Sequence, residues 1–214
     1  MKATNTPVKH TSLIRMGGLA AIVGGFAATI LGLRYVLQAW GMTLDFTEKT
    51  LQKGGYEGPV STMLLVGALA AIATMHLMQR QRYGRLGALA SIAAIGGIAM
   101  VLIGFFVSGL ASDMAFTVGI SLLTAGVVVG STGIVVLGTV TIGAGVMPRW
   151  CGIALIAGSP PGVGILFMFS IPLAIMVNLP GTIGWALAGI PWIAVGYAAF
   201  RAATRQAQQP SRVQ

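Results

Sequence analysis

The chain has 214 residues, of which 56% are hydrophobic and only 8% are charged, and its mean hydropathy is +0.87. Soluble domains carry roughly 25% charged residues, so this composition excludes a globule surrounded by water, and it equally excludes a polar, disordered chain. We therefore expect an all-α integral membrane protein, because a helix satisfies its backbone hydrogen bonds within a single segment of lipid-embedded chain.

Six apolar stretches follow one another, and each approaches the length of about 20 residues that a membrane span requires. The predicted spans are 13–37, 60–78, 86–110, 114–138, 151–177 and 182–200. Residues 41–58 form a predicted outer loop, and residues 201–214 form a predicted polar cytoplasmic tail. The sequence thus predicts one polytopic membrane domain over residues 1–214, a transmembrane bundle of six spans.

The positions of the basic residues predict the orientation of this bundle. With a cytoplasmic N-terminus, the three outer basic residues are Arg34, Lys49 and Lys53. The ten inner ones are Lys2, Lys9, Arg15, Arg80, Arg82, Arg85, Arg149, Arg201, Arg205 and Arg212. Because Lys and Arg are enriched in cytoplasmic loops, we expect both termini to lie in the cytoplasm.

The net charge of +9 does not indicate nucleic-acid binding, because the basic residues form no patch with interleaved aromatic side chains. The cluster of Arg80, Arg82 and Arg85 is most simply a determinant of topology. It also suits the headgroup of an anionic lipid, which makes the lipid bilayer the first expected partner.

Three odd-numbered spans begin with similar residues. Arg15-Met-Gly-Gly-Leu-Ala-Ala-Ile resembles Arg85-Leu-Gly-Ala-Leu-Ala-Ser-Ile, and less closely Arg149-Trp-Cys-Gly-Ile-Ala-Leu-Ile. One interpretation is a bundle of three helix hairpins related by parallel repeats, as in some transporters. The other is that any span starting inside shows a basic residue before small apolar ones.

Residue types that carry chemistry are scarce. His10 and His76 are the only histidines, and no metal-binding or haem-binding pair is present, so no metal and no cofactor are expected. No serine-hydrolase or nucleotide-binding motif occurs, so no catalytic residue is predicted and the protein is not expected to be an enzyme. No span carries a charged residue near its middle, which disfavours ion-coupled transport.

The fourth span has two distinct faces. A narrow stripe of small residues comprises Ala115, Gly119, Gly126, Gly130 and Gly133, and its Gly126-Val-Val-Val-Gly130 segment predicts close helix packing. The opposite side carries the hydroxyl residues Thr117, Ser121, Thr124, Ser131, Thr132 and Thr139. This polar side either lines a cavity or packs against a further helix.

The fifth span is interrupted by Gly158-Ser159-Pro160-Pro161-Gly162. Adjacent prolines remove two backbone donors, and the freed carbonyls need neighbouring groups, water or a ligand. The break is therefore either a kink shaped for packing or part of a site. The candidate ligand-binding residues are Ser131, Thr132, Ser159, Pro160 and Pro161, and we expect the three hydroxyl residues among them at a similar depth. Without a carboxylate, these residues suit a neutral or lipid-like molecule.

The segment Met147-Pro148-Arg149-Trp150 leads into Cys151-Gly152 at the start of the fifth span. With the six-span layout, it resembles a loose group of uncharacterised bacterial six-helix integral membrane proteins, in which a Leu/Met-Pro-Arg-Trp loop opens a late span. The resemblance implies a multi-pass protein of the bacterial inner membrane. It implies no activity and no functional residues.

These observations favour a structural, accessory or partner-binding membrane protein. Its expected partner is another membrane protein or a second copy of the chain. The alternative is a small carrier or binder of a neutral or lipid-like molecule, with its site between spans four and five.

Overall fold

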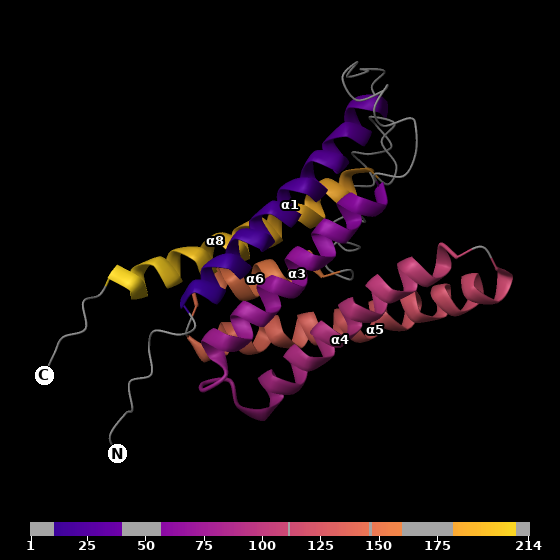
Figure 1. Cartoon of the computed structure of the whole chain (residues 1–214). Helices are drawn as coiled ribbons and strands as arrows, with labels where there is room; N and C mark the ends of the chain where they lie inside the picture. Colours follow the sequence, from indigo (N-terminus) through magenta and orange to yellow (C-terminus); the bar gives the residue numbers. More distant parts are fainter. Residues whose placement is uncertain (1–10, 40–56, 111, 146, 160–181, 209–214) are drawn as a thin grey trace, which may run out of the picture.

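The computed structural model describes residues 11–39, 57–110, 112–145, 147–159 and 182–208. These residues form helices and contain no strand, which confirms the all-α prediction for this part of the chain. In chain order the helices are α1 (Thr11–Ala39), α3 (Glu57–Gln79), α4 (Gly84–Ser108), α5 (Asp113–Ala144), α6 (Arg149–Gly158) and α8 (Thr182–Gln208) (Figure 1).

Four segments are long and apolar enough to cross a membrane: Thr11–Ile30, Thr62–Gln79, Gly84–Ser108 and Asp113–Ala144. They lie within the first four predicted spans or overlap them closely, and they indicate a membrane protein. The 32 residues of α5 have a length of about 48 Å, which exceeds the hydrocarbon core of about 30 Å. In a bilayer, a helix of this length would tilt or extend into the headgroup region.

Two helices continue beyond the predicted ends of their spans. We predicted the end of the fourth span at residue 138 and a polar tail from residue 201, but α5 continues to Ala144 and α8 to Gln208. The reason is tertiary packing, because Thr141 and Ala203 are both fully buried. In contrast, α6 ends at Gly158, and the rest of the predicted span 151–177 lies outside the described residues.

The helices pack in two groups that contact each other. One group consists of α1, α3 and α8, and the other consists of α4, α5 and α6, with α5 between α4 and α6. Contacts of α6 with α8 and of α3 with α4 join the two groups. Figure 1 shows the far ends of α4 and α5 extending beyond the other helices.

Glycines allow α1 and α8 to approach backbone to backbone. A Cβ atom on Gly18 would lie 2.8 Å from the carbonyl oxygen of Gly196, and one on Gly25 would lie 2.7 Å from that of Gly189. The two positions are seven residues apart on each helix, which is about two turns. The antiparallel helices therefore repeat the same close contact along one seam, and van der Waals packing of this kind stabilises helix pairs in lipid.

The predicted glycine stripe of α5 packs against α4. Its four glycines, Gly119, Gly126, Gly130 and Gly133, are all buried. A Cβ atom on Gly126 would lie 2.6 Å from the carbonyl oxygen of Gly97, and one on Gly104 would lie 2.7 Å from that of Gly119. The prediction of close packing on this face is confirmed, and the structure adds that the partner is the preceding helix.

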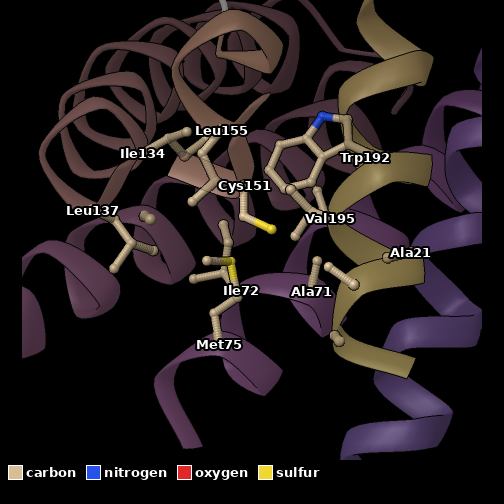
Figure 2. Packing of buried hydrophobic residues seen from close by; sticks show 14 of the residues in the cluster. Ala21, Ala71, Ile72, Met75, Ile134, Leu137, Cys151, Leu155, Trp192 and Val195 are labelled. Atoms are coloured by element: carbon tan, nitrogen blue, oxygen red, sulfur yellow. The ribbon is translucent and has the colours of Figure 1, made fainter. Parts of the chain in front are cut away.

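A buried apolar cluster joins α3, α5, α6 and α8 (Figure 2). The residues that meet there include Ile72, Met75, Leu137, Cys151, Leu155, Trp192 and Val195, and each is at most 5% exposed. This cluster anchors the short α6 and brings the C-terminal end of α3 next to α5 and α6.

Seven arginines share one end of the bundle, which we call the basic end: Arg15, Arg80, Arg82, Arg85, Arg149, Arg201 and Arg205. Helix contacts place them there. The Arg15 guanidinium lies 5.5 Å from the centre of the Phe200 ring, and Thr141 near the end of α5 contacts Gln79 at the end of α3. Asp113 lies at the opposite end, where the α4–α5 connection turns.

Candidate functional site

The structure separates two neighbouring residues of the predicted ligand site. Ser131 is 6% exposed, whereas Thr132 is exposed on another side of α5. Their hydroxyl groups donate to the carbonyl oxygens of Val127 and Val128, one turn earlier in the same helix. The two side chains therefore do not converge on one ligand.

The predicted helix break in the fifth span is confirmed at Gly158, where α6 ends. Ser159 has an extended backbone with φ of −72° and ψ of 152°, as the steric clash with a following proline requires. Its buried hydroxyl donates to the carbonyl oxygen of Ile156 at 2.5 Å. Pro160 and Pro161 lie outside the described residues.

The C-terminal end of α6 faces α8. A Cβ atom on Gly158 would lie 2.9 Å from Cβ of Pro191 and 3.5 Å from Nε1 of Trp192. Helix α6 meets α5 nearer its beginning, where a Cβ atom on Gly138 would lie 2.7 Å from the carbonyl oxygen of Gly152. The segment that ends in Ser159 is thus positioned by α8 as well as by α5.

The hydroxyl side of α5 faces outward. Five of its residues, Thr117, Ser121, Thr124, Thr132 and Thr139, are exposed. Each donates at 2.9 Å to the carbonyl oxygen four residues earlier. Such bonds make a hydroxyl tolerable in lipid. We expected this side either to line a cavity or to pack on a further helix, and in the described residues it does neither.

Sequence analysis missed a cluster of polar side chains at the turn between α3 and α4. This turn cluster comprises His76, Gln79, Tyr83, Ser91 and Thr141. The carbonyl oxygen of Gln79 accepts from the backbone N–H groups of Arg82 at 2.8 Å and Tyr83 at 3.2 Å, which closes the turn. Gly84 then adopts a φ of +64°, a conformation that glycine allows at little cost.

Tyr83 folds back into the space between α3 and α4. A Cβ atom on Gly87 would overlap the tyrosine ring, so the small residue at this position makes room for it. The Tyr83 hydroxyl contacts Nδ1 of His76 and lies 3.2 Å from Oγ of Ser91. Because Ser91 donates its only proton to the carbonyl oxygen of Gly87 at 2.9 Å, the tyrosine proton is available for His76 or Ser91.

Burial raises the pKa of Tyr83 above its ordinary value, and the hydrogen bond with Ser91 lowers it in part. Tyr83 lies in the turn between the candidate membrane spans Thr62–Gln79 and Gly84–Ser108. Since an ordinary tyrosine already titrates near pH 10, the hydroxyl stays protonated at neutral pH. It therefore serves as a hydrogen-bond donor that holds α3 to α4.

Gln79 and Thr141 connect the turn to α5. Both residues are fully buried, and the Thr141 hydroxyl donates to Oε1 of Gln79 at 3.2 Å. Nε2 of Gln79 is buried and has no hydrogen-bond partner among the described residues. A buried donor without a partner costs about 1–3 kcal/mol, so this amide lowers the stability of the folded bundle.

The chemistry of the turn cluster is hydrogen bonding through hydroxyl, imidazole and carboxamide groups. Within the part of the chain that the structure describes, no group of three or more His, Cys, Asp and Glu residues could hold a metal ion. Sequence analysis named His76 from this cluster, and it named the nearby Arg80, Arg82 and Arg85. Nothing local in the sequence indicated that Gln79 would be buried by α5, which begins 34 residues later.

Replacing Tyr83 with phenylalanine is expected to destabilise the protein by about 1 kcal/mol, because the hydroxyl bonds across the turn are lost while the ring remains. A fall of a few degrees in Tm in detergent would report this loss. Tyr197→Phe is the matched control, since that side chain is 52% exposed. Equal melting temperatures for the two variants would contradict a bridging role for Tyr83.

The motif Met147-Pro148-Arg149-Trp150 has a clear structural role at the start of α6. Met147 is 4% exposed and enters the core, and Pro148 is the N-cap residue, with its carbonyl oxygen accepting from the N–H of Cys151 at 2.9 Å. Arg149 and Trp150 are exposed.

No protein-family model, curated protein or solved structure matches the chain.

Proposed function

We propose that the protein is a six-span inner-membrane protein with cytoplasmic termini and a structural or partner-binding role. The four long apolar helices would supply four spans, while α8 and the segment that begins with α6 would supply the other two, giving three hairpins. The basic end supports this orientation, because seven arginines would then lie on the cytoplasmic side.

The contrast between exposed helix faces carries this proposal. The exposed side of α1 consists of the large apolar residues Leu13, Met16, Leu19, Val23, Phe26, Ile30 and Leu33, spaced three or four residues apart. Such a stripe suits lipid chains. The exposed side of α5 carries hydroxyl residues at positions 117, 121, 124, 132 and 139, which share one stripe of that helix with the apolar Val128. Large apolar residues, Met114, Phe116, Val118, Ile120 and Val129, flank this stripe, so the contrast with α1 lies in the added hydroxyl groups.

Hydroxyl residues are typical of contacts between membrane helices, because they permit close approach and can share a hydrogen bond with a neighbour. The glycine side of α5 is already occupied by α4, so the hydroxyl side is the face left for a partner. We assign it to a transmembrane helix of another subunit. The function is then assembly or support of a membrane complex, without chemistry of its own.

A carrier role is the second candidate, and the early end of α6 favours it. Its 10 residues span about 15 Å, roughly half of the hydrocarbon core. A helix that ends at such a depth places carbonyl groups where a small polar molecule could be held.

Photocrosslinking in native membranes tests the two functions. A photoreactive amino acid at Thr124 is expected to capture a protein, whereas one at Ile92, on the exposed apolar side of α4, is expected to capture lipid. The mass of the adduct distinguishes a second copy from another protein. Equal protein capture at both positions, or at neither, would contradict the proposal.

A small molecule that co-purifies with wild type and is lost from the Pro160→Ala/Pro161→Ala variant would favour the carrier role.

A further inference from the structure

The contact between α3 and α4 is closed near their turn and opens with distance from it. The Tyr83 hydroxyl contacts His76 of α3 and lies 3.2 Å from Oγ of Ser91 of α4, so His76 and Ser91 face each other at one level. Ile98 and Phe105 follow Ser91 at steps of seven residues, or about two turns, and lie on the same side of α4. Exposure along this side rises from 0% at Ser91 and 5% at Ile98 to 44% at Phe105. Burial on the α3 side of α4 is therefore lost away from the turn.

The outer half of the α4–α5 hairpin buries only its own seam. Within residues 101–110 of α4 and 113–125 of α5, the buried residues are Gly104 and Gly119. A Cβ atom on Gly104 would lie 2.7 Å from the carbonyl oxygen of Gly119, so each is buried by the other helix of the hairpin. Figure 1 shows this end of the hairpin diverging from α1 and α3. Helices α3 and α4 thus form the two sides of a wedge that opens away from the basic end.

Helices α4 and α5 are joined as one unit, whereas their connection to α3 is a short turn. The α4–α5 seam continues inward from Gly104, because a Cβ atom on Gly133 would lie 2.8 Å from the carbonyl oxygen of Ala90. In the turn, Gly84 has a φ of +64°, and a Cβ atom there would meet nothing within 4 Å. A change of direction at Gly84 would therefore move α4 and α5 together without a clash in the turn.

The apolar spans on the two sides of the wedge differ in length. The span Thr62–Gln79 of α3 has 18 residues, or about 27 Å, whereas the span Gly84–Ser108 of α4 has 25 residues, or about 38 Å. The hydrocarbon core of a bilayer is about 30 Å thick. A span that matches the core stands upright, and a longer one tilts. The divergence of α4 from α3 is the geometry that lets both spans match one bilayer.

We propose that the α3–α4 turn is a hinge that responds to the thickness of the bilayer. In a thin bilayer the α4–α5 hairpin tilts away from α3, as it does in this structure. In a thick bilayer the hairpin stands more upright and the wedge closes. Because the helices are antiparallel, closure continues the register of the His76–Ser91 pair and places Thr62 opposite Phe105, each fourteen residues from that pair. The hinge goes beyond the partner-binding role and does not require another subunit on α5.

The polar contacts between the two sides lie beside the turn. Tyr83 holds α4 to α3, and the Thr141 hydroxyl holds α5 to Gln79 at the end of α3. The second contact is incomplete, because Nε2 of Gln79 has no partner among the described residues. A swing about the turn displaces atoms least at this end and most at the outer end. These contacts therefore hold the pivot of the hairpin without restraining its outer half.

The test measures the separation of α3 and α4 in the full-length protein by spin-label distances. Discs of dimyristoylphosphatidylcholine supply a thin bilayer, and discs of dierucoylphosphatidylcholine supply a thick one. The labels replace Met63 and Phe106, which are 52% and 68% exposed, and the buried Cys151 is replaced by alanine. In the thick bilayer the mean distance is expected to be shorter by several ångströms, as the helix axes approach the packed spacing of roughly 8–10 Å. Equal distances in the two lipids would overturn the hinge.

A matched pair of labels shows whether the hairpin moves as one unit. Ile103 and Ile120 are both exposed and flank the Gly104–Gly119 contact. Their distance is expected to be the same in both lipids. A change as large as that between α3 and α4 would overturn the hinge in favour of splaying within the hairpin.

Disulfide formation provides a second measurement that needs no label. In a variant with Thr62→Cys, Phe105→Cys and Cys151→Ala, the oxidised fraction is expected to be several-fold higher in the thick bilayer than in the thin one, because closure brings the two positions together. An equal oxidised fraction in both lipids, or no disulfide in the thick bilayer, would overturn the closed register.

Discussion

Gly97→Ala is expected to destabilise the protein by roughly 3 kcal/mol or more, whereas the same substitution at the adjacent Gly96 should be neutral or slightly stabilising. A Cβ atom at Gly97 would overlap the backbone N and Cα of Gly130 and lie 2.7 Å from the carbonyl oxygen of Gly126. Because all three atoms belong to backbone, no rotamer change relieves the overlap, and α4 must separate from α5. A Cβ atom at Gly96 would meet nothing within 4 Å.

The comparison is made by Tm and by resistance to proteolysis in detergent, with both alanine variants purified in parallel. Gly130→Ala provides a graded control on the facing helix. Its added Cβ would lie 3.4 Å from the Gly97 backbone, an ordinary contact, so a much smaller loss is expected. If Gly96→Ala and Gly97→Ala melted at the same temperature, the α4–α5 seam described above would be wrong.

The sequence predicted this seam only in part, and the reason is geometric. A helical period of 100° per residue shows which residues of α5 share a face, and small residues on that face indicate close packing. The pattern does not identify the partner, because α1, α4 and α8 also contain glycines seven residues apart. That Gly97 of α4 faces Gly126 of α5 follows from the turn between them and was found only in the structure.

Helix ends were predicted less well than helix faces. The apolar run of α5 weakens near residue 138, but Thr141 is held in the bundle by its hydrogen bond to Gln79. The two residues are 62 positions apart, so no local pattern links them. The end of α8 was also predicted too early, since Ala203 is fully buried beyond Arg201.

The candidate site shows that residues at a similar predicted depth in the membrane need not point toward one another. Ser131, Thr132 and Ser159 were grouped because they lie at similar predicted depth. Successive residues of a helix point about 100° apart, so Ser131 enters the bundle while Thr132 faces outward. The break before Pro160 was predictable, because proline restricts the residue before it whatever the tertiary structure.

Gly189→Ala is expected to destabilise the protein about as much as Gly97→Ala, because it acts on the contact that joins α1, the first described helix, to α8, the last. The added Cβ would overlap the carbonyl oxygen of Gly25 and Oγ1 of Thr29, and it would lie 2.8 Å from the backbone N of Thr29. Separation of α1 from α8 would also disturb Trp192, which is 5% exposed and packs in the central cluster (Figure 2). A loss of roughly 3 kcal/mol is expected, measured as a fall in Tm.

Two variants show whether contact with the α1 backbone causes the expected loss of stability in Gly189→Ala. Ile190→Leu changes the next residue, which is 53% exposed, and is expected to leave Tm unchanged. Thr29→Ala combined with Gly189→Ala removes the overlap with Oγ1 but leaves the overlap with the carbonyl oxygen of Gly25. Little recovery is therefore expected in the double variant. Full recovery would mean that the Thr29 side chain, and not the approach of the two backbones, limits the size of the residue at position 189.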